Sequence, residues 1–419
     1  MRVRLHSRRA KRLRYQHLER LDPTPAGRFF SCRSDFLTAS VASTASLTAM
    51  LRTTPLAVFF LVACAALPAP EVVIQVEPPT GEQSQDRARI VAAFERAEPG
   101  DTIRFAAGTY EVGPIIRVVT PDLTLLGHPD GTTLRGGDGF DAGADFGIEQ
   151  DAIDALGVLH LFEGGAVVRG LTFTDSFWGL LLGWHFGLEW DERMPENPGG
   201  FTVEGNTFRN VRNGIRLTSW GEARTVVREN TFEDARFGVG AIGSGITIEG
   251  NRFALLSEAS QDDTDSAIAI GGERVAASSS DNLVAGNEIL GHRTGVLLYI
   301  DGARIGTGNI VRDNRIDLRA EGGLAGVVLI VRGERGADGP PAGGLIGTLI
   351  EQNAVTGATW AAISIGAGCN DSRVVGNTFS ELQGPAISLD GSGTEVSGHA
   401  PDIEIRQAET SVQPAAENP

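Results

Sequence analysis

Residues 201–253 read FTVEGNTFRNVRNGIRLTSWGEARTVVRENTFEDARFGVGAIGSGITIEGNRF, and this stretch decides the fold because one short pattern occurs in it three times. The pattern is apolar-x-x-Asn-x-apolar, as in Val203, Asn206 and Phe208. Along the whole chain it occurs seven times, with intervals of 21–27 residues and two enlarged ones. Such a period is typical of a solenoid with loop insertions. The repeated asparagines are Asn206, Asn230, Asn251, Asn287, Asn314, Asn353 and Asn377.

A second short stretch follows the asparagine units and alternates apolar residues with a period of two, as in 214–217 and 295–298. This period predicts strands with one face inward. Two or three short strands per turn, stacked at a fixed period, make a parallel β-helix. We therefore expect inward ladders of Val, Ile and Phe, and asparagines at sharp turns whose amides bond from coil to coil.

Composition and charge exclude several classes of mechanism and partner. The chain has 419 residues with a net charge of −17, and Lys11 is its only lysine, so no mechanism can need a lysine in the folded body. Residues 1–49 carry +7 and the chain from Cys64 onward carries −25. A nucleic-acid partner is excluded because phosphates need a basic face. A polyanionic glycan would be repelled unless calcium bridged it, whereas a neutral glycan or a protein partner fits. The 54 glycines suit a chain that turns in every coil.

The N-terminal part of the sequence has the features of an export signal. Met50 opens a short charged region and an apolar run that ends at Cys64, which predicts a signal peptide over 50–65. Leu61-Val62-Ala63-Cys64 resembles the bacterial lipobox, whose cysteine is acylated. The alternative is an A-x-A cleavage site and a soluble secreted protein. We expect export to the outer membrane or cell surface as a lipoprotein, with a lipid anchor as the only membrane contact, or else a periplasmic or secreted protein.

The remaining boundaries follow from the same patterns. Residues 1–49 are interpreted as a non-native upstream extension or a disordered basic arm, 66–83 as a linker and first strand, and 409–419 as a disordered tail. The stretch 84–97 has an amphipathic helical pattern, and the β-helix is expected to extend to 408. Cys369 is expected to be a small buried residue that fills a coil.

The sequence resembles the right-handed parallel β-helix, or pectin-lyase-like, superfamily. The resemblance lies in the asparagine repeat, in a helix over 84–97, and in the Pro99-Gly100-Asp101 and Gly108-Thr109-Tyr110 stretches that follow the helix. The resemblance implies an all-β solenoid of about ten coils with a short N-terminal capping helix. It says little about activity, because the superfamily includes lyases, hydrolases, epimerases and non-enzymatic adhesins.

The repeat predicts two columns of side chains that face outward from the sheets. One alternates in charge (Glu204, Arg228, Glu249) and predicts a cross-strand charge ladder. The other is nearly apolar, so we expect long loops or a partner to cover it. Arg216 is its only charge, and Tyr299 follows two residues after one of its members. This second column is Leu181, Arg216, Gly240, Ala269, Leu297, Val328, Ser364 and Ser388.

Aromatic residues give the candidate substrate site. Four tryptophans fall within 43 residues, and flat indoles beside acids suit the apolar C–H faces of sugar rings; the alternative is a loop that packs its own aromatics onto the sheet. The predicted carbohydrate-binding residues are Trp178, Trp184, Trp190, Trp220 and Tyr299. The catalytic candidates for an enzyme are Arg216 as charge stabiliser, with His185, Asp191 and Glu192 in acid–base roles.

Calcium is the only cofactor that the sequence suggests. Asp138 and Asp141 lie in a Gly-Gly-Asp-Gly-Phe-Asp stretch that resembles one calcium-binding nonapeptide turn. Asp262, Asp263 and Asp265 form a second acidic stretch, for which a solvated loop is the alternative.

The sequence is therefore compatible with three functions. The first is a protein that binds or processes carbohydrate, and the second is a non-catalytic surface scaffold or adhesin. The third is a calcium-dependent polysaccharide lyase. Whether the protein is an enzyme is left open, because the motif sets of the superfamily's hydrolases and epimerases are missing, and His128, His292 and His399 lack the usual companions. An enzyme would be a polysaccharide lyase or a glycoside hydrolase.

Overall fold

The computed structural model describes residues 72–137, 157–184, 199–220, 222–256, 266–272, 278–302, 304–318, 322–332, 343–400 and 403–407. All of them belong to one compact unit, Pro68–Pro419. The other unit, Met1–Leu67, lies outside the described residues, so the signal peptide and Cys64 remain predictions. No helix in the described part is long and apolar enough to cross a membrane.

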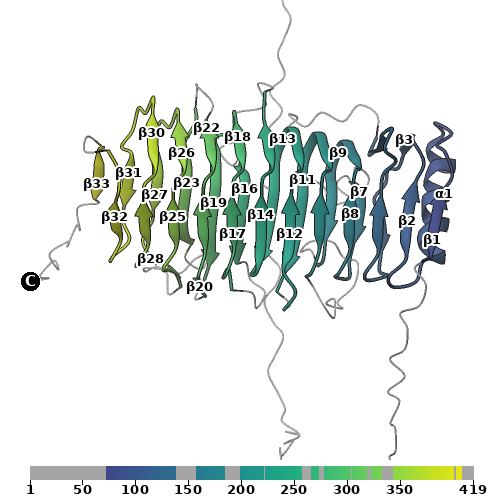
Figure 1. The fold of residues 1–419 in the computed structure, drawn as a ribbon, viewed down its shortest axis with the longest axis horizontal. Helices are drawn as coiled ribbons and strands as arrows, with labels where there is room; N and C mark the ends of the chain where they lie inside the picture. The colour runs from purple at the N-terminus through teal and green to yellow at the C-terminus, as the bar shows by residue number, and fades with distance from the viewer. Residues whose placement is uncertain are drawn as a thin grey trace, which may run out of the picture. The chain divides into compact units, whose positions relative to one another are not determined.

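The described chain is a stack of parallel coils that begins at helix α1 (Gln83–Arg96) (Figure 1). The helix was predicted within one residue at each end. It buries Ile90, Ala93 and Phe94, which recur at helical spacing, and packs against the first coil. Asp86 is buried at its first turn and accepts hydrogen bonds from Thr80 N (2.6 Å) and Thr80 Oγ1 (2.8 Å). Burial raises the pKa of Asp86, but the hydrogen bonds outweigh it and hold that pKa below its usual range.

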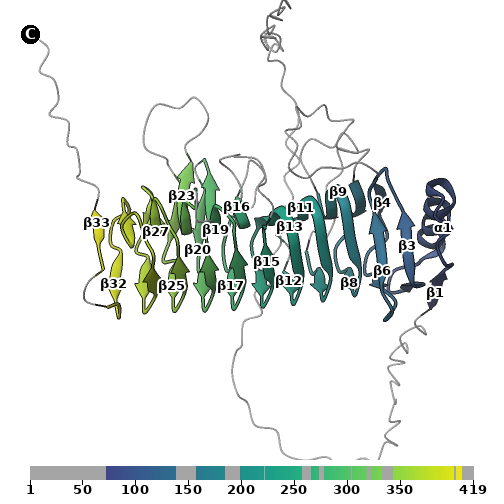
Figure 2. The same ribbon diagram turned by 90° about the horizontal axis from the view of Figure 1, so that it is seen from above.

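One face of the stack is sheet A, whose 12 strands are parallel and lie in chain order. This number is close to the ten or so coils expected. Figure 2 shows the same order of coils from another side, from α1 to β33. The strands of sheet A are β1 (Val73–Val76), β2 (Thr102–Phe105), β5 (Thr124–Leu126), β8 (Val167–Arg169), β10 (Thr202–Glu204), β12 (Thr225–Arg228), β14 (Ile246–Glu249), β17 (Leu283–Ala285), β21 (Ile310–Arg312), β25 (Leu349–Glu351), β29 (Arg373–Val375) and β32 (Glu395–Ser397).

The rest of each coil is sheet B, which has two halves called B1 and B2 here. Strands β9 (Thr172–Leu182), β11 (Thr207–Ser219) and β13 (Thr231–Gly243) run through both halves. B1 also contains β3 (Gly108–Glu111), β6 (Thr132–Arg135), β15 (Arg252–Ala254), β18 (Glu288–Leu290), β22 (Arg315–Asp317), β26 (Ala354–Thr356) and β30 (Thr378–Ser380). B2 also contains β4 (Ile116–Val118), β7 (Gly157–Leu161), β16 (Ser266–Gly272), β19 (Thr294–Asp301), β23 (Ala325–Arg332), β27 (Ala361–Ile365), β31 (Ile387–Leu389) and β33 (Ile405–Gln407).

A short third sheet links three of the later coils, with the order β20 (Ile305–Thr307), β24 (Gly344–Ile346) and β28 (Cys369–Asn370). Cys369 lies fully buried here, as predicted. Burial raises the pKa of its thiol to about 12, so the thiol stays protonated near neutral pH and is no nucleophile.

Apolar ladders fill the interior, as the repeat predicted. Phe173, Phe208, Phe232 and Phe253 are fully buried and stack face to face along B1. Their ring centroids are 5.0, 4.8 and 4.5 Å apart, with planes within 8° of parallel. These distances match the ordinary spacing between neighbouring strands, about 4.8 Å, so one ring is added by each coil.

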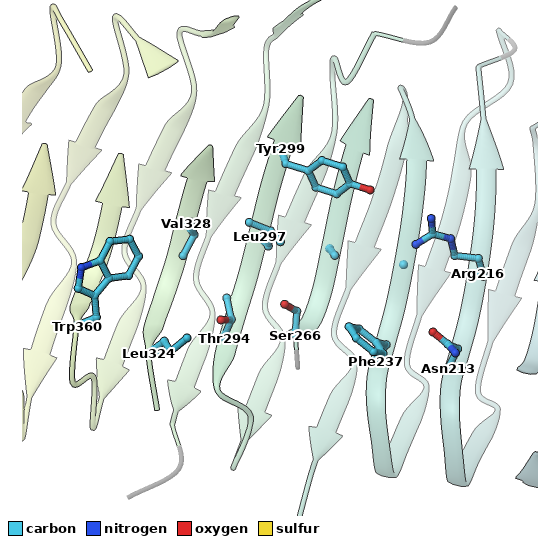
Figure 3. Close-up of a pocket in the computed structure, with 12 residues that line it drawn as sticks. Asn213, Arg216, Phe237, Ser266, Thr294, Leu297, Tyr299, Leu324, Val328 and Trp360 are labelled. Atoms are coloured by element: carbon cyan, nitrogen blue, oxygen red, sulfur yellow. The ribbon is translucent and has the colours of Figure 1, made fainter. Parts of the chain in front are cut away.

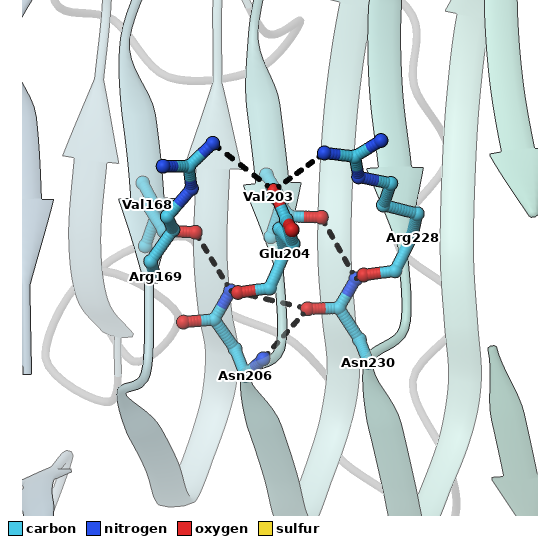
Figure 4. A network of polar contacts seen from close by, with 7 residues as sticks. All are labelled: Val168, Arg169, Val203, Glu204, Asn206, Arg228 and Asn230. Atoms are coloured by element: carbon cyan, nitrogen blue, oxygen red, sulfur yellow. Dashed lines mark hydrogen bonds and ion pairs between the residues drawn. The ribbon is translucent and has the colours of Figure 1, made fainter. Parts of the chain in front are cut away.

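The repeated asparagines form the expected ladder. All seven are buried, and each Nδ2 donates to the Oδ1 of the next asparagine at 2.9–3.1 Å, from Asn206 to Asn377. Each Nδ2 also donates to a carbonyl oxygen of the preceding coil, as Asn206 does to Val168 (2.9 Å) (Figure 4). The buried amides of the asparagine ladder are thereby satisfied.

The sharp turn at each rung involves a different residue from the one expected. We expected the asparagine itself to take the turn conformation. In the structure the residue before it has the positive φ, as in Gly205 (63°), Glu229 (56°) and Gln352 (55°). The last rung is not an asparagine: Gly398 has a φ of 71°, and the ring of His399 lies 2.9 and 3.1 Å from the carbonyl oxygens of Asn377 and Val374. His399 therefore ends the ladder, which agrees with a structural role.

The charge ladder on the outer face of sheet A is also confirmed. Glu204 pairs in register with Arg169 and Arg228, and its Oε2 lies 3.1 and 3.0 Å from their guanidinium groups (Figure 4). The hydrogen bond from Arg228 is the main cause that holds the pKa of Glu204 below its usual range. This face is a salt-bridged surface of partly exposed side chains, and such pairs contribute little stability individually.

Candidate functional site

The outward column predicted from the repeat exists as one continuous row across B2. The strand pairings place Arg216 beside Leu181 and Gly240, then continue to Ala269 and Leu297. The row goes on through Val328, Ser364 and Ser388. Beyond its N-terminal end lie His160 and Arg117, which the sequence analysis did not place in the row.

The five members of this row from Arg216 to Val328 form the floor of a groove with a volume of about 350 Å³ that crosses B2 from β11 to the start of β27 (Figure 3). Five strand spacings separate Arg216 at one end from Trp360 at the other, a span of about 24 Å. Leu297 and Val328 make the middle of the floor apolar. The lining residues are Asn213, Arg216, Phe237, Gly240, Ser266, Ala269, Thr294, Leu297, Tyr299, Leu324, Val328 and Trp360.

Two glycines give the groove its shape. A Cβ at Gly240 would lie only 2.9 Å from Nη1 of Arg216, so the arginine side chain extends across that glycine. A Cβ at Gly271 would overlap the ring of Tyr299, so this ring lies directly over Gly271 on the neighbouring strand. Tyr299 is only 4% exposed, whereas Trp360 is 52% exposed at the far end. Glycine at these two positions makes room for the side chains that bound the groove.

Polar groups line one side of the groove, with Phe237 between Asn213 and Ser266 in the order of the strands. Asn213, Ser266 and Thr294 all start the B2 part of their strands, three residues before the floor row, and Ser266 pairs with Thr294. An amide and two hydroxyls offer both hydrogen-bond donors and acceptors without formal charge. Arg216 is the only formally charged residue among the twelve that line the groove.

The structure brings together two of the predicted site residues and separates others. Arg216 and Tyr299 line the same groove. Trp178 pairs with Asn213 at the start of the B2 part of β9, and Trp184 follows the end of that strand by two residues. Trp220 follows the end of β11. These three tryptophans are partly buried and are not among the groove's lining residues.

The other predicted residues lie outside the described part of the chain. They are His185, Trp190, Asp191 and Glu192, and the calcium candidates Asp138, Asp141, Asp262, Asp263 and Asp265. Their roles remain predictions. In the part that the structure describes, no three His, Cys, Asp or Glu residues are grouped so that they could hold a metal ion.

The sequence analysis missed six of the lining residues, namely Asn213, Phe237, Ser266, Thr294, Leu324 and Trp360. Trp360 and Leu324 each precede a B2 strand by one residue, and Trp360 N donates to the Leu324 carbonyl oxygen at 3.1 Å, which places them on neighbouring coils. Extending the predicted column alignment by one residue before each strand would have found this pair. Phe237 could have been found from the same column as Asn213.

His160 is the titratable group nearest the row that the sequence analysis did not consider. It is 1% exposed and its Nε2 lies 2.7 Å from the Gly183 carbonyl oxygen. Burial is the main cause that lowers its pKa to about 4, so the imidazole is neutral near pH 7. Its place beside Leu181 lies outside the lining of the groove.

Comparisons with known proteins agree with this architecture. The family model described as the right-handed beta helix region matches residues 196–331. The tailspike protein of E. coli bacteriophage HK620, in a mutant form, is 17% identical with a TM-score of 0.50, and the match covers 80% of this chain and 64% of the tailspike. Endo-xylogalacturonan hydrolase from Aspergillus tubingensis is 13% identical with a TM-score of 0.47, with coverage of 80% and 95%.

A further tailspike structure from the same phage, in complex with a pentasaccharide, is 16% identical with a TM-score of 0.45, covering 80% of this chain and 65% of the tailspike. No curated protein sequence matches this chain. The fold is that of the right-handed parallel β-helix superfamily, and at these identities the likeness to the solved structures concerns the fold.

Proposed function

We propose that this protein binds an oligosaccharide in the groove across B2, with the sugar chain lying along the row of outward residues. The observation that carries the proposal is the lining itself: a half-exposed indole, a tyrosine ring and an apolar floor, beside a row of hydroxyl and amide groups. Sugar rings have apolar C–H faces and polar edges, so they match a surface that is apolar on its floor and polar along one side.

The charge of the groove favours a mostly neutral sugar. Only Arg216 among the lining residues has a formal charge, and the chain from Cys64 onward carries −25. A glycan with a carboxylate on every ring would meet one cation and a strongly negative protein, so its binding would be opposed. A neutral chain loses nothing to this repulsion.

Binding, rather than bond cleavage, is the activity that the described groove supports. General acid–base catalysis needs a titratable side chain within hydrogen-bond reach of the scissile bond. Among the residues that line the groove, none is an aspartate, glutamate or histidine, and Tyr299, whose phenol could also serve as an acid or base, is only 4% exposed. We therefore propose a carbohydrate-binding surface protein, which combines the first two functions considered from the sequence.

The test is a calorimetric binding screen of the purified protein against neutral and acidic oligosaccharides, with and without calcium, together with analysis for released products. We expect a neutral oligosaccharide to bind without turnover, and Trp360→Ala to weaken it by about tenfold or more, because exposed aromatic anchors dominate such interfaces.

Trp184→Ala is the matched control, since it removes an indole outside the groove lining. A loss with Trp184→Ala or Trp190→Ala but not with Trp360→Ala would favour the site predicted from the sequence instead. No binding to any glycan would refute carbohydrate binding altogether.

We further propose that the protein is exported and acylated at Cys64, which would hold the β-helix at the bacterial envelope. The support is the order of charged region, apolar run and Leu61-Val62-Ala63-Cys64. Mass spectrometry of the native N-terminus should find an acylated Cys64, whereas a free Ala66 terminus would refute the anchor.

A further inference from the structure

The charge in the groove is confined to one end. Arg216 lies on β11, and the four following members of the floor row, Gly240 to Val328, are uncharged. At the opposite end are the apolar side chains of Leu324 and Trp360. The groove is therefore polarised along its length, with a cation at one end and an exposed indole about 24 Å away.

The guanidinium is directed along the floor. It extends across Gly240, where any larger residue would collide with Nη1, and Figure 3 shows it at the β11 end of the groove. A guanidinium carries five N–H donors in a planar fork, which suits a carboxylate better than a neutral hydroxyl. A ligand that occupies the whole groove brings one of its ends to this fork.

We propose that the preferred ligand is a sugar chain with a single carboxylate at one end, bound with that carboxylate at Arg216 and its uncharged rings extending toward Trp360. This inference rests on the proposed function and adds the ligand's charge pattern and its direction in the groove. Arg216 is then the residue that orients the chain, because the described residues that line the groove include no second cation that could accept the reversed orientation.

The experiment compares matched probes that differ only in terminal charge. Cello-, manno-, xylo- and maltopentaose are each prepared as the alditol, which is neutral, and as the aldonate, which carries one terminal carboxylate. Calorimetry measures both affinities, and the readout is their ratio. We expect the aldonate of the best-bound sugar to bind about tenfold more tightly than its alditol, and high salt to reduce that ratio.

Arg216→Gln should bring the ratio close to one, and Arg216→Lys should keep part of it, because an ammonium retains the charge but loses the fork. Arg228→Gln is the matched control: it removes an arginine from the outer face of sheet A and should leave the ratio unchanged. Trp360→Ala should weaken alditol and aldonate equally.

The outcomes separate the two proposals. If an alditol binds and its aldonate gains nothing, the orientation by Arg216 is overturned while oligosaccharide binding stands. If Arg228→Gln lowers the ratio as much as Arg216→Gln, the preference comes from general surface charge and the inference is also overturned. If no probe binds in either form, both proposals are overturned.

Discussion

Replacing Asn251 with alanine tests whether the asparagine ladder stabilises the solenoid. The side chain of Asn251 donates to the Val227 carbonyl oxygen (2.9 Å) and to Asn287 Oδ1 (3.0 Å). Its Oδ1 accepts from both the backbone and the side-chain nitrogen of Asn230, each at 3.0 Å. Asn251→Ala removes these four bonds and the one from Nδ2 to the Glu249 carbonyl oxygen (3.2 Å), at a position that is 1% exposed.

The groups that remain set the size of the effect. Asn287 Oδ1 keeps the backbone N–H of residue 251 (2.9 Å), and Asn230 Nδ2 keeps the Val203 and Arg228 carbonyl oxygens. The backbone N–H of Asn230 loses the acceptor at Asn251 and stays buried. A buried donor left without a partner costs about 1–3 kcal/mol, and the other bonds contribute about 1 kcal/mol net. We expect a loss of about 2–4 kcal/mol in the free energy of unfolding.

Urea denaturation followed by circular dichroism measures this loss, provided that the slope with urea is unchanged. Glu249→Ala is the control two residues away, on an exposed side chain, and should change stability by less than about 0.5 kcal/mol. Asn251→Asp distinguishes the loss of side-chain volume from the loss of hydrogen bonds. It keeps the volume of the side chain but places an oxygen, instead of the N–H donor, against the Val227 carbonyl oxygen. The reasoning would be refuted if Asn251→Ala cost no more than Glu249→Ala, or if Asn251→Asp were neutral at pH 7.

Two further predictions concern the packing around the site. The pKa of His160 is about 4 in the folded protein against 6.5 for a free histidine, so the unfolded chain binds more protons between these two pH values. The free energy of unfolding therefore falls by about 3 kcal/mol as the pH drops from 7 to 4. His160→Gln should remove this part of the pH dependence in urea titrations, and an unchanged slope would contradict it. Gly214→Ala should cost about 1–3 kcal/mol, because its Cβ would lie 2.7 Å from the Phe232 ring and 2.7 Å from the Gly238 carbonyl oxygen. An unaltered urea midpoint would mean that the stacked ring moves freely.

The fold was predictable because its determinants recur within each coil. A single coil places one asparagine, one inward valine or isoleucine and one inward phenylalanine or isoleucine, and repetition makes the pattern visible in the sequence. The same register predicted the outward row through Arg216, and every neighbour in it was confirmed by strand pairing. The turn residue was assigned wrongly, because asparagine is the residue that recurs and tolerates a turn, whereas the residue before it, which has the positive φ, varies among Gly, Glu, Asp and Gln.

The groove was only partly predictable. Arg216 and Tyr299 are on strands, where period-two alternation fixes the direction of a side chain. Trp360 and Leu324 precede their strands, outside the range of that rule. The room that Gly240 and Gly271 leave for Arg216 and Tyr299 depends on contacts between residues 24 and 28 positions apart in the sequence, so no local pattern predicts it.

The stacking of B2 has a consequence for the range of ligand lengths. Each coil adds one rung to the asparagine ladder and one position to the groove floor, so the groove can be lengthened only in steps of about 4.8 Å. Duplicating or deleting one whole coil would change the reach of the groove by one step and leave the bonding of the remaining rungs intact. If the proposed sugar site is correct, the number of coils between Arg216 and Trp360 sets the length of sugar chain that the groove can hold.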